Sequence, residues 1–162
     1  MISLIQFENM HVYVHLTQGY EAEFSGLTRK TPDENGLFKV QTHIDDNHTG
    51  YLLFNGKIPI GFMVIQTGAV HDVSEFYIVP SQRLTAAGKR LAKAVFQKHP
   101  GAWQVRQIEG AEGAKKFWRK VIGEITGNDY VEDELLDERW GRVTRQTFYI
   151  SRNDGNIPGW VV

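Results

Sequence analysis

One stretch of the sequence combines small residues and cations in an order that suits the binding of a phosphate group. An apolar segment ends at Pro80, a short polar loop follows, and small residues then open an amphipathic helix. The residues that would surround the anion are Arg83, Leu84, Thr85, Ala86, Ala87, Gly88 and Lys89. The first turn of a helix leaves backbone N–H groups unpaired, and residues without bulky side chains let an anion approach them closely. The run therefore predicts a pyrophosphate site.

A plain strand–turn–helix, with small residues for close packing, is the alternative that the spacing alone leaves open. Neither of two common phosphate-binding motifs is present, because the sequence contains no GxGxxG and no GxxxxGK[ST]. Arg83 and Lys89 favour the anion site, since each would place a full positive charge beside the partial charge at the start of the helix.

The segments around this run alternate between strand and helix periodicity. Strands are expected at residues 2–6, 51–54, 58–66, 74–79, 103–108 and 142–151, with the tight turn Asn55-Gly56 between the second and third. Apolar residues recur at helical spacing in three places: Met10, Tyr13, Val14, Thr17, Tyr20 and Phe24; Leu84, Ala87, Leu91, Ala94 and Val95; and Ala114, Phe117, Trp118, Val121 and Ile122. Glu21 and Glu23 are expected on the more polar side of the first helix. The pattern predicts one α/β (α+β) domain with a mixed sheet over residues 1–162. Residues 151–162 are expected to form an irregular tail, and Trp160 could dock this tail onto the domain.

Composition excludes several classes of protein. The 162 residues include 18 Lys and Arg against 19 Asp and Glu, so the basic excess of a duplex-binding protein is missing. The absence of cysteine removes disulfides, thiolate nucleophiles and cysteine-ligated zinc. No apolar stretch approaches the roughly 20 residues of a spanning helix, and the N-terminal segment lacks the features of a signal peptide. We therefore expect a cytoplasmic protein that binds neither nucleic acid nor membrane.

With its flanks, the run resembles the acyl-CoA-binding motif of the GNAT superfamily of N-acetyltransferases, [Q/R]-x-x-G-x-[G/A]. The resemblance rests on RLTAAG at 83–88, the strand end FYIVP at 76–80, WQVR at 103–106 and AKKFWR at 114–119. It covers residues 50–123 and, more loosely, the N-terminal helix, and it is similar in particular to bacterial members of the superfamily. It implies a GNAT-like sheet that is splayed at its centre and flanked by helices.

The family pattern is altered at three positions. Ala86 replaces the first glycine of the motif and is small enough to keep the loop. Ala111 stands where an asparagine often opens the next helix, so one side-chain hydrogen bond to the pantetheine arm is lost. Trp118 stands where many members have a tyrosine that protonates the leaving thiolate, and an indole N–H is not a useful acid. These changes motivate a second hypothesis, a non-catalytic module that keeps the fold for acyl-CoA sensing or protein interaction.

The resemblance implies that acetyl-CoA, as co-substrate, lies between the strands at 74–79 and 103–108. A primary amine on a small molecule, a lysine or a protein N-terminus would attack the thioester directly, without a covalent enzyme intermediate. The implied activity is therefore that of an N-acetyltransferase, and a homodimer is expected by analogy. The cofactor-binding positions carried over from the family are Ile78 and Val79 for the pantetheine, the run from Arg83 to Lys89 for the pyrophosphate, and Trp118.

Glu75 is the first candidate for the base that takes the proton of the attacking amine. It is the only acid expected in the apolar strand at 74–79, and burial would raise its pKa towards the working range. A strand-end carboxylate bonded to a neighbour is the alternative. Tyr77 projects on the same strand face and could donate a proton or simply pack. Tyr130 and Tyr149 are further candidate acids, for which core packing is the alternative role.

Two other groups of polar residues also have a functional and a structural interpretation. His11 and His15 lie one helical turn apart, but no third ligand accompanies them, so a solvated pair is expected rather than a metal site. Residues 132–138 contain five acids, which indicates a solvated loop or short helix, or an electrostatic attractor for a cationic amine. Charge is thus divided along the chain, because residues 83–98 hold cations and no acid.

Overall fold

A seven-stranded mixed sheet organises the computed structural model of the chain, which describes residues 1–152. The strands lie in the order β1-β2-β3-β4-β5-β7-β6, and every neighbouring pair is antiparallel except β4 and β5. The strands are β1 (Ile2–Leu4), β2 (His48–Asn55), β3 (Ile58–Gln66), β4 (Val70–Ile78), β5 (Gly101–Ile108), β6 (Tyr130–Asp137) and β7 (Gly141–Ile150), and the helices are α1 (Met10–Thr28), α2 (Ala87–Lys98) and α3 (Glu112–Thr126). Short 3-10 helices precede α1 and α2, η1 (Phe7–Asn9) and η2 (Pro80–Gln82). The expected mixed α/β (α+β) architecture is confirmed, while the expected docking of Trp160 lies outside the described residues.

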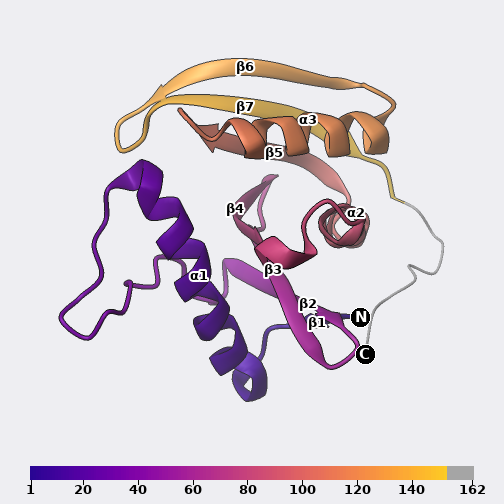
Figure 1. Ribbon diagram of the computed structural model, residues 1–162. Coiled ribbons are helices and arrows are strands. Elements are labelled where there is room, and N and C mark those ends of the chain that lie inside the picture. The colour runs from indigo at the N-terminus through magenta and orange to yellow at the C-terminus, as the bar shows by residue number, and fades with distance from the viewer. Residues whose placement is uncertain (153–162) are drawn as a thin grey trace.

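The sheet separates two apolar cores, one under α1 and the other under α2 and α3 (Figure 1). Side chains alternate along β2, so Tyr51 and Leu53 enter the core of α2 and α3 while Leu52 enters the core of α1. Aromatic rings fill much of the larger core, where the centroids of Phe96 and Trp103 are 4.7 Å apart. Within residues 1–152, no helix is both long enough and apolar enough to span a membrane.

The centre of the sheet is splayed, as the resemblance implied. β4 and β5 pair in parallel only at Val70–Asp72 and Ala102–Gln104, although β4 continues to Ile78 and β5 to Ile108. Beyond these three residue pairs, each strand therefore presents an edge to the other without ladder hydrogen bonds. β4 also begins at Val70 rather than at residue 74, so the strand contains a second acid, Asp72, that the sequence reading placed outside it.

A β-bulge in β4 decides which side chains reach each core. Val64 of β3 pairs with Glu75, but the next residue, Ile65, pairs with Val73, so Ser74 is the extra residue on β4. In a regular strand Val73 and Glu75 would point to the same face. With the bulge, Val73 packs against the core of α2 and α3, whereas Glu75 turns to the face covered by α1.

The acid-rich segment is a strand, and the expectation of a loop or short helix at 132–138 is wrong. β6 pairs along its whole length with β7, as in the register of Asp133 with Arg145 and of Leu135 with Val143. Acidic residues have low strand propensity, but opposite charges directly across an antiparallel pair are stabilising. Arg145 bonds the Asp133 carboxylate at 2.6 Å, a partner that cannot be read from the local sequence.

Candidate functional site

The open edge of β4 presents backbone groups to the space between β4 and β5. The Val79 N–H donates to the Ile60 carbonyl of β3 at 2.9 Å, so Val79 is turned towards β3. Successive residues of a strand alternate in direction, so the N–H groups of Phe76 and Ile78 are turned towards the opening. The Ile78 carbonyl confirms this direction, because it accepts a 2.8 Å hydrogen bond from Nε of Arg83 outside the sheet. Of the two pantetheine-binding positions expected from the resemblance, the N–H of Ile78 is available and that of Val79 is committed to β3.

The N-terminus of α2 lies directly after this edge and carries N–H groups that have no partner among residues 1–152. The first intrahelical bond runs from the Arg90 N–H to the Ala86 carbonyl at 2.9 Å, so the N–H groups of Gly88 and Lys89 have no carbonyl of the helix to bond. The Ala87 N–H donates to Thr85 Oγ1 at 3.2 Å. Ala86 is exposed, so an anion can approach it from solvent.

Gly88 is buried, and its lack of a side chain serves the close packing of α2. A Cβ at this position would lie 3.2 Å from the Phe117 ring and 3.4 Å from Ile78 Cγ1. Leu84, in the loop before the helix, is fully exposed and adopts a left-handed φ of 62°. A bulky residue in that region costs on the order of 1 kcal/mol, and such strain is concentrated at functional loops.

Both cations of the predicted anion site are engaged in ion pairs with acids from other elements. An Arg83 guanidinium nitrogen lies 2.8 Å from a Glu23 oxygen of α1, and Lys89 Nζ lies 2.9 Å from a Glu124 oxygen of α3. All four side chains are well exposed to solvent, where such a pair contributes about 0–1 kcal/mol. A phosphate group can therefore compete for either cation at little cost.

Glu75 is buried against α1 with a hydrogen-bonded carboxylate. The Tyr13 hydroxyl donates to Glu75 Oε2 at 2.8 Å. Burial raises the pKa of Glu75, the nearby charge of Glu21 raises this pKa further, and hydrogen bonds from Tyr13 and Thr42 oppose the rise. The carboxyl thus holds its proton more tightly than an exposed glutamate does, which is the property required of a base for an ammonium group.

Tyr77 lies on the same face of β4 as Glu75 and packs against α1. Its hydroxyl sits so close to Gly19 that a Cβ there would lie 2.7 Å from the oxygen. The Arg83 guanidinium carbon lies 5.7 Å from the centre of the Tyr77 ring. Burial raises the pKa of the Tyr77 hydroxyl, the charge of Glu23 adds to this rise and Arg83 opposes it. Tyr77 thus links the candidate base to the start of the predicted anion site.

The other aromatic candidates lie away from Glu75. Trp118 is buried among apolar rings, with its centroid 4.9 Å from that of Phe76 on β4 and 5.0 Å from that of Phe117. It therefore lines the core side of the splayed strands. Tyr130 is half-buried and packs against the same core. Tyr149 is largely exposed, so the core-packing role considered for it is wrong.

Glu21 is buried on α1, and the expectation that it lies on the polar side of the helix is wrong. It is eight residues after Tyr13 and four after Thr17, and all three are buried. Residues at i, i+4 and i+8 share a helix face, so spacing alone could have placed Glu21 in this stripe. The polarity of the carboxylate, in contrast, favours the solvent side of the helix. Glu23, expected there for the same reason, is exposed.

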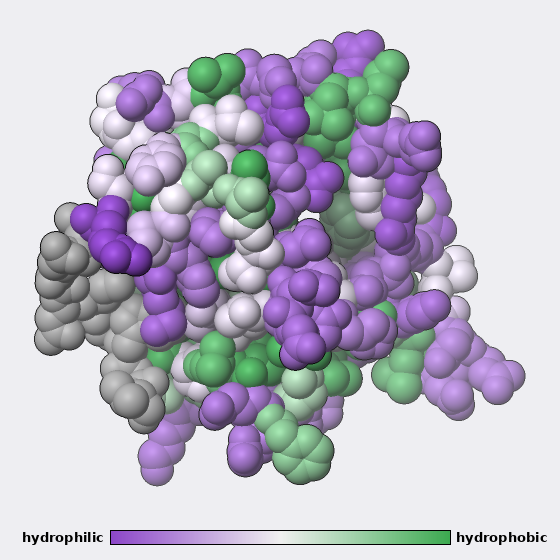
Figure 2. Space-filling view, turned by 180° about the vertical axis from the view of Figure 1, so that it is seen from behind, coloured by the Kyte–Doolittle hydropathy of each residue, from purple (hydrophilic) through white to green (hydrophobic). Residues whose placement is uncertain are grey.

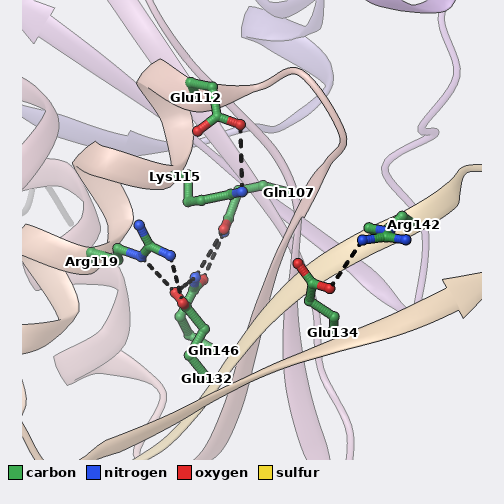
Figure 3. A network of polar contacts seen from close by, with 8 residues as sticks. All are labelled: Gln107, Glu112, Lys115, Arg119, Glu132, Glu134, Arg142 and Gln146. Carbon is green, nitrogen blue, oxygen red and sulfur yellow. Dashed lines mark hydrogen bonds and ion pairs between the residues drawn. The ribbon is translucent and has the colours of Figure 1, made fainter.

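The acids of β6 are mostly neutralised by arginines. Glu132 accepts two hydrogen bonds from Arg119, at 2.8 and 2.6 Å, and a third from Gln146, which also exchanges hydrogen bonds with Gln107 (Figure 3). Glu134 pairs with Arg142 at 3.7 Å. These partners argue against an open acidic surface at 132–138 that would attract a cationic amine. They indicate instead that the acids of β6 stabilise its packing against α3 and β7.

We expect Glu132→Gln to lower stability at neutral pH by about 1 kcal/mol, the scale of a partly exposed charged pair. Arg119 holds the pKa of Glu132 at about 2, below its ordinary 4.5, with Gln146 assisting. A lowered folded pKa contributes stability that is present above pH 4.5 and lost as the pH falls towards 2. Urea unfolding should therefore separate wild type and variant at neutral pH but not near pH 2. Glu34→Gln, at an exposed position, is the control. If wild type and Glu132→Gln differed equally in the free energy of unfolding at both pH values, the lowered pKa assigned to Glu132 would be contradicted.

The two histidines of α1 do not form part of a metal site among the described residues. The rings of His11 and His15 are 6.1 Å apart, and within residues 1–152 no group of three His, Asp or Glu side chains could hold a metal ion.

Comparison with known proteins agrees with this geometry. No protein-family model matches the sequence, and no curated protein is detectably similar to it. Solved structures do match. A chimera of the spermidine N-acetyltransferase SpeG from Vibrio cholerae and hSSAT is 9% identical with a TM-score of 0.60, over 92% of this chain and 96% of that one. The CoA-dependent acyl-homoserine lactone synthase BjaI, with SAM and isopentyl-CoA, is 15% identical with a TM-score of 0.58, over 94% and 84%.

A third match is a protein described as a streptothricin acetyltransferase from Bacillus anthracis, in complex with acetyl-CoA. It is 16% identical with a TM-score of 0.51, over 66% of this chain, which spans 65% of that protein's length. Other matching structures are assigned to the GNAT family of acetyltransferases. At these identities the likeness shows the fold. The chain has the fold of the GNAT acetyltransferases, and the structures that share this fold include acetyltransferases and acyl-CoA-dependent synthases.

Proposed function

We propose that the chain is an acyl-CoA-dependent N-acyltransferase that transfers an acetyl group to a primary amine. One observation carries the proposal. The splay of β4 and β5 opens a backbone edge that leads from the buried carboxylate of Glu75 to the unpaired N–H groups at the start of α2. The fold alone supports an acyl-CoA donor. The position of Glu75 supports an acceptor whose nucleophile must lose a proton, and a primary amine, which is an ammonium ion at neutral pH, is the acceptor that we propose.

The donor would lie along this edge. The N–H groups of Phe76 and Ile78 would bond the pantetheine arm, and the N–H groups of Gly88 and Lys89 would bond the pyrophosphate. Arg83 and Lys89 would exchange their exposed carboxylate partners for phosphate oxygens. We assign Leu84, Thr85, Ala86 and Ala87 to the loop that shapes this anion site, and Val79 and Trp118 to the apolar wall behind the arm.

Glu75 would act on the acceptor. The amine nitrogen attacks the carbonyl carbon of the thioester, a C–N bond forms, and the C–S bond breaks to release CoA as the thiolate. Before the attack the ammonium group passes one proton to the Glu75 carboxylate, directly or through a water molecule, and as the amide forms the nitrogen gives up a second proton, which neutralises the thiolate. Tyr13 holds that carboxylate in place through its 2.8 Å hydrogen bond. Tyr77, on the same face, is the candidate that we propose to relay a proton to the leaving group.

Arg83→Glu should weaken acetyl-CoA binding by about tenfold or more, since it replaces a cation beside the pyrophosphate with an anion. Calorimetric titration of acetyl-CoA into the purified protein measures this directly. Lys57→Glu, a charge reversal in the exposed turn between β2 and β3, is the matched control and should bind as the wild type does. Glu23→Gln, which frees Arg83 from its ion pair, should bind acetyl-CoA at least as tightly.

The same titration tests the proposal as a whole. Absence of heat with acetyl-CoA and with longer acyl-CoA thioesters would refute an acyl-CoA-dependent activity. Binding without thiol release over a broad panel of amines would favour a non-catalytic acyl-CoA sensor, the alternative that the buried Trp118 motivates. Comparing acetyl-CoA with longer thioesters in the thiol-release assay decides the acyl group.

A further inference from the structure

One oxygen of a buried carboxylate on α1 lacks a hydrogen-bond partner among the described residues. The Glu21 side chain is only 2% exposed, and its Oε2 accepts no hydrogen bond from any atom within residues 1–152. Lys30 Nζ lies 3.7 Å from this oxygen, which is an ion pair but too long for a hydrogen bond. Burial raises the pKa of Glu21, and Lys30 and the charge of Arg139 oppose the rise. A buried carboxylate that is only partly satisfied is costly, and proteins retain such groups where a ligand completes them.

The ammonium group of Lys30 also faces an aromatic ring. Its Nζ lies 5.7 Å from the centre of the Trp140 ring, in the turn between β6 and β7, and the guanidinium carbon of Arg139 lies 4.6 Å from the centre of the same ring. Asp137 fixes this turn, because its side chain accepts a hydrogen bond from the backbone N–H of Trp140 at 2.9 Å, and the Trp140 ring lies 6.0 Å from that of Phe24 on α1. A cation between a carboxylate and an aromatic face is the arrangement by which proteins bind alkylammonium ligands. Lys30 thus occupies, with imperfect geometry, a site suited to a better-fitting ammonium group.

This site lies on the same face of α1 as the candidate base. Tyr13 bonds Glu75, and Glu21 follows Tyr13 by eight residues, which is roughly 12 Å along the helix axis. The two carboxylates are close enough for the charge of Glu21 to raise the pKa of Glu75. Figure 2 shows a hollow on the side of the molecule where α1 lies, walled mainly by hydrophilic residues and with apolar residues in its depth. A ligand with positive charges at both ends would neutralise both carboxylates.

We propose that the acceptor is a primary amine carrying a second cationic group, a diamine in its simplest form, and that Glu21 and Trp140 bind the distal ammonium after displacing Lys30. The proposal rests on the acyltransferase function proposed above. The ammonium group beside Glu75 gives one proton to Glu75 and a second to the leaving thiolate as it becomes the amide nitrogen, while the distal amine remains protonated in its ion pair with Glu21. Lys30 acts as an internal competitor that keeps the buried carboxylate compensated until the substrate arrives.

Calorimetric titration with cadaverine and with n-pentylamine tests this site without requiring turnover. The two probes have the same chain length and differ only in the distal ammonium. The wild type should bind cadaverine about tenfold more tightly, and the isosteric Glu21→Gln should abolish the difference. Lys30→Ala should tighten cadaverine binding several-fold, because the internal competitor is gone. Equal binding of both probes by the wild type, or weaker cadaverine binding by Lys30→Ala, would overturn the proposal.

Opposite effects of the two variants separate a binding role from a structural one. If the Glu21–Lys30 pair only stabilised the fold, both variants would unfold more easily and neither would change the preference for cadaverine. Titration of acetyl-CoA into the same preparations isolates the proposed function. Retained acetyl-CoA binding without a preference for cadaverine refutes the diamine proposal alone. If the wild type does not bind acetyl-CoA but binds cadaverine in a way that depends on Glu21, the acyltransferase function is refuted and the cation site is retained.

Discussion

Glu75→Gln is expected to lower the rate of acyl transfer by about a hundredfold or more, the usual contribution of a positioned general base. The glutamine keeps the shape of the side chain and can still accept the hydrogen bond from Tyr13, but it cannot take a proton at neutral pH. Binding of acetyl-CoA should be unchanged, because the carboxylate lies on the α1 face of β4 and the proposed cofactor contacts lie along its open edge. Thiol release under saturating acetyl-CoA, together with calorimetry, measures both quantities.

Two further variants test whether the lower rate of acyl transfer is caused by the loss of the Glu75 carboxylate. Glu8→Gln makes the same chemical change at an exposed position and should leave the rate unaltered. Tyr13→Phe removes a hydrogen bond that lowers the pKa of Glu75, so the pKa of Glu75 should rise. The acidic limb of the pH profile of kcat/KM should then move to higher pH. Wild-type turnover in Glu75→Gln would eliminate Glu75 as the base, and an unmoved limb in Tyr13→Phe would assign that limb to another group.

Phe96→Ala should destabilise the protein by about 3–5 kcal/mol, as expected when a large ring is removed from a close-packed core. Phe96 is fully buried on α2, with its centroid 4.7 Å from that of Trp103 and 5.2 Å from that of Phe148. Its ring therefore joins α2 to β5 and β7 on the side opposite α1. Thermal unfolding should show Tm lower by about 10 °C, and urea unfolding should give the free energy.

The exposed Phe7 provides the control for that measurement. It is 93% exposed, so Phe7→Ala removes the same side chain without opening a cavity and should change stability by less than about 0.5 kcal/mol. A fall of less than about 1 kcal/mol in Phe96→Ala would mean that the core of α2 and α3 is loosely packed and collapses around the missing ring. That result would contradict the packing described for this side of the sheet.

Much of the fold could be predicted because its signals are local. The hairpin of β2 and β3 follows from the Asn55-Gly56 turn between two apolar runs, and α2 and α3 follow from apolar residues at helical spacing. The strand β6 was missed because its stability comes from arginines on other elements. Arg119 of α3 and Arg145 of β7 neutralise its acids, and neither partner is visible in the local sequence.

Part of the candidate site could be predicted for the same reason. The loop after Pro80, the start of α2 and the base candidate Glu75 lie within one contiguous segment, where order along the chain nearly equals order in space. The charges of this segment could not be read so simply. Arg83 and Lys89 are bound to Glu23 and Glu124 in the structure, and these acids lie on helices far from them in sequence.

The sequence by itself determined the pattern of strands and helices apart from β6, the resemblance to GNAT acetyltransferases and the stretch of chain that faces the proposed cofactor. These are properties of neighbouring residues, which local periodicity and turn chemistry control. Only the tertiary structure decided that the bulge at Ser74 turns Glu75 towards α1, that Glu21 is buried on the same face, and that Lys30 and Trp140 meet beside it. Those relations depend on how α1, β4 and the turn after β6 pack together, and burial and charge are set by partners that are distant in sequence.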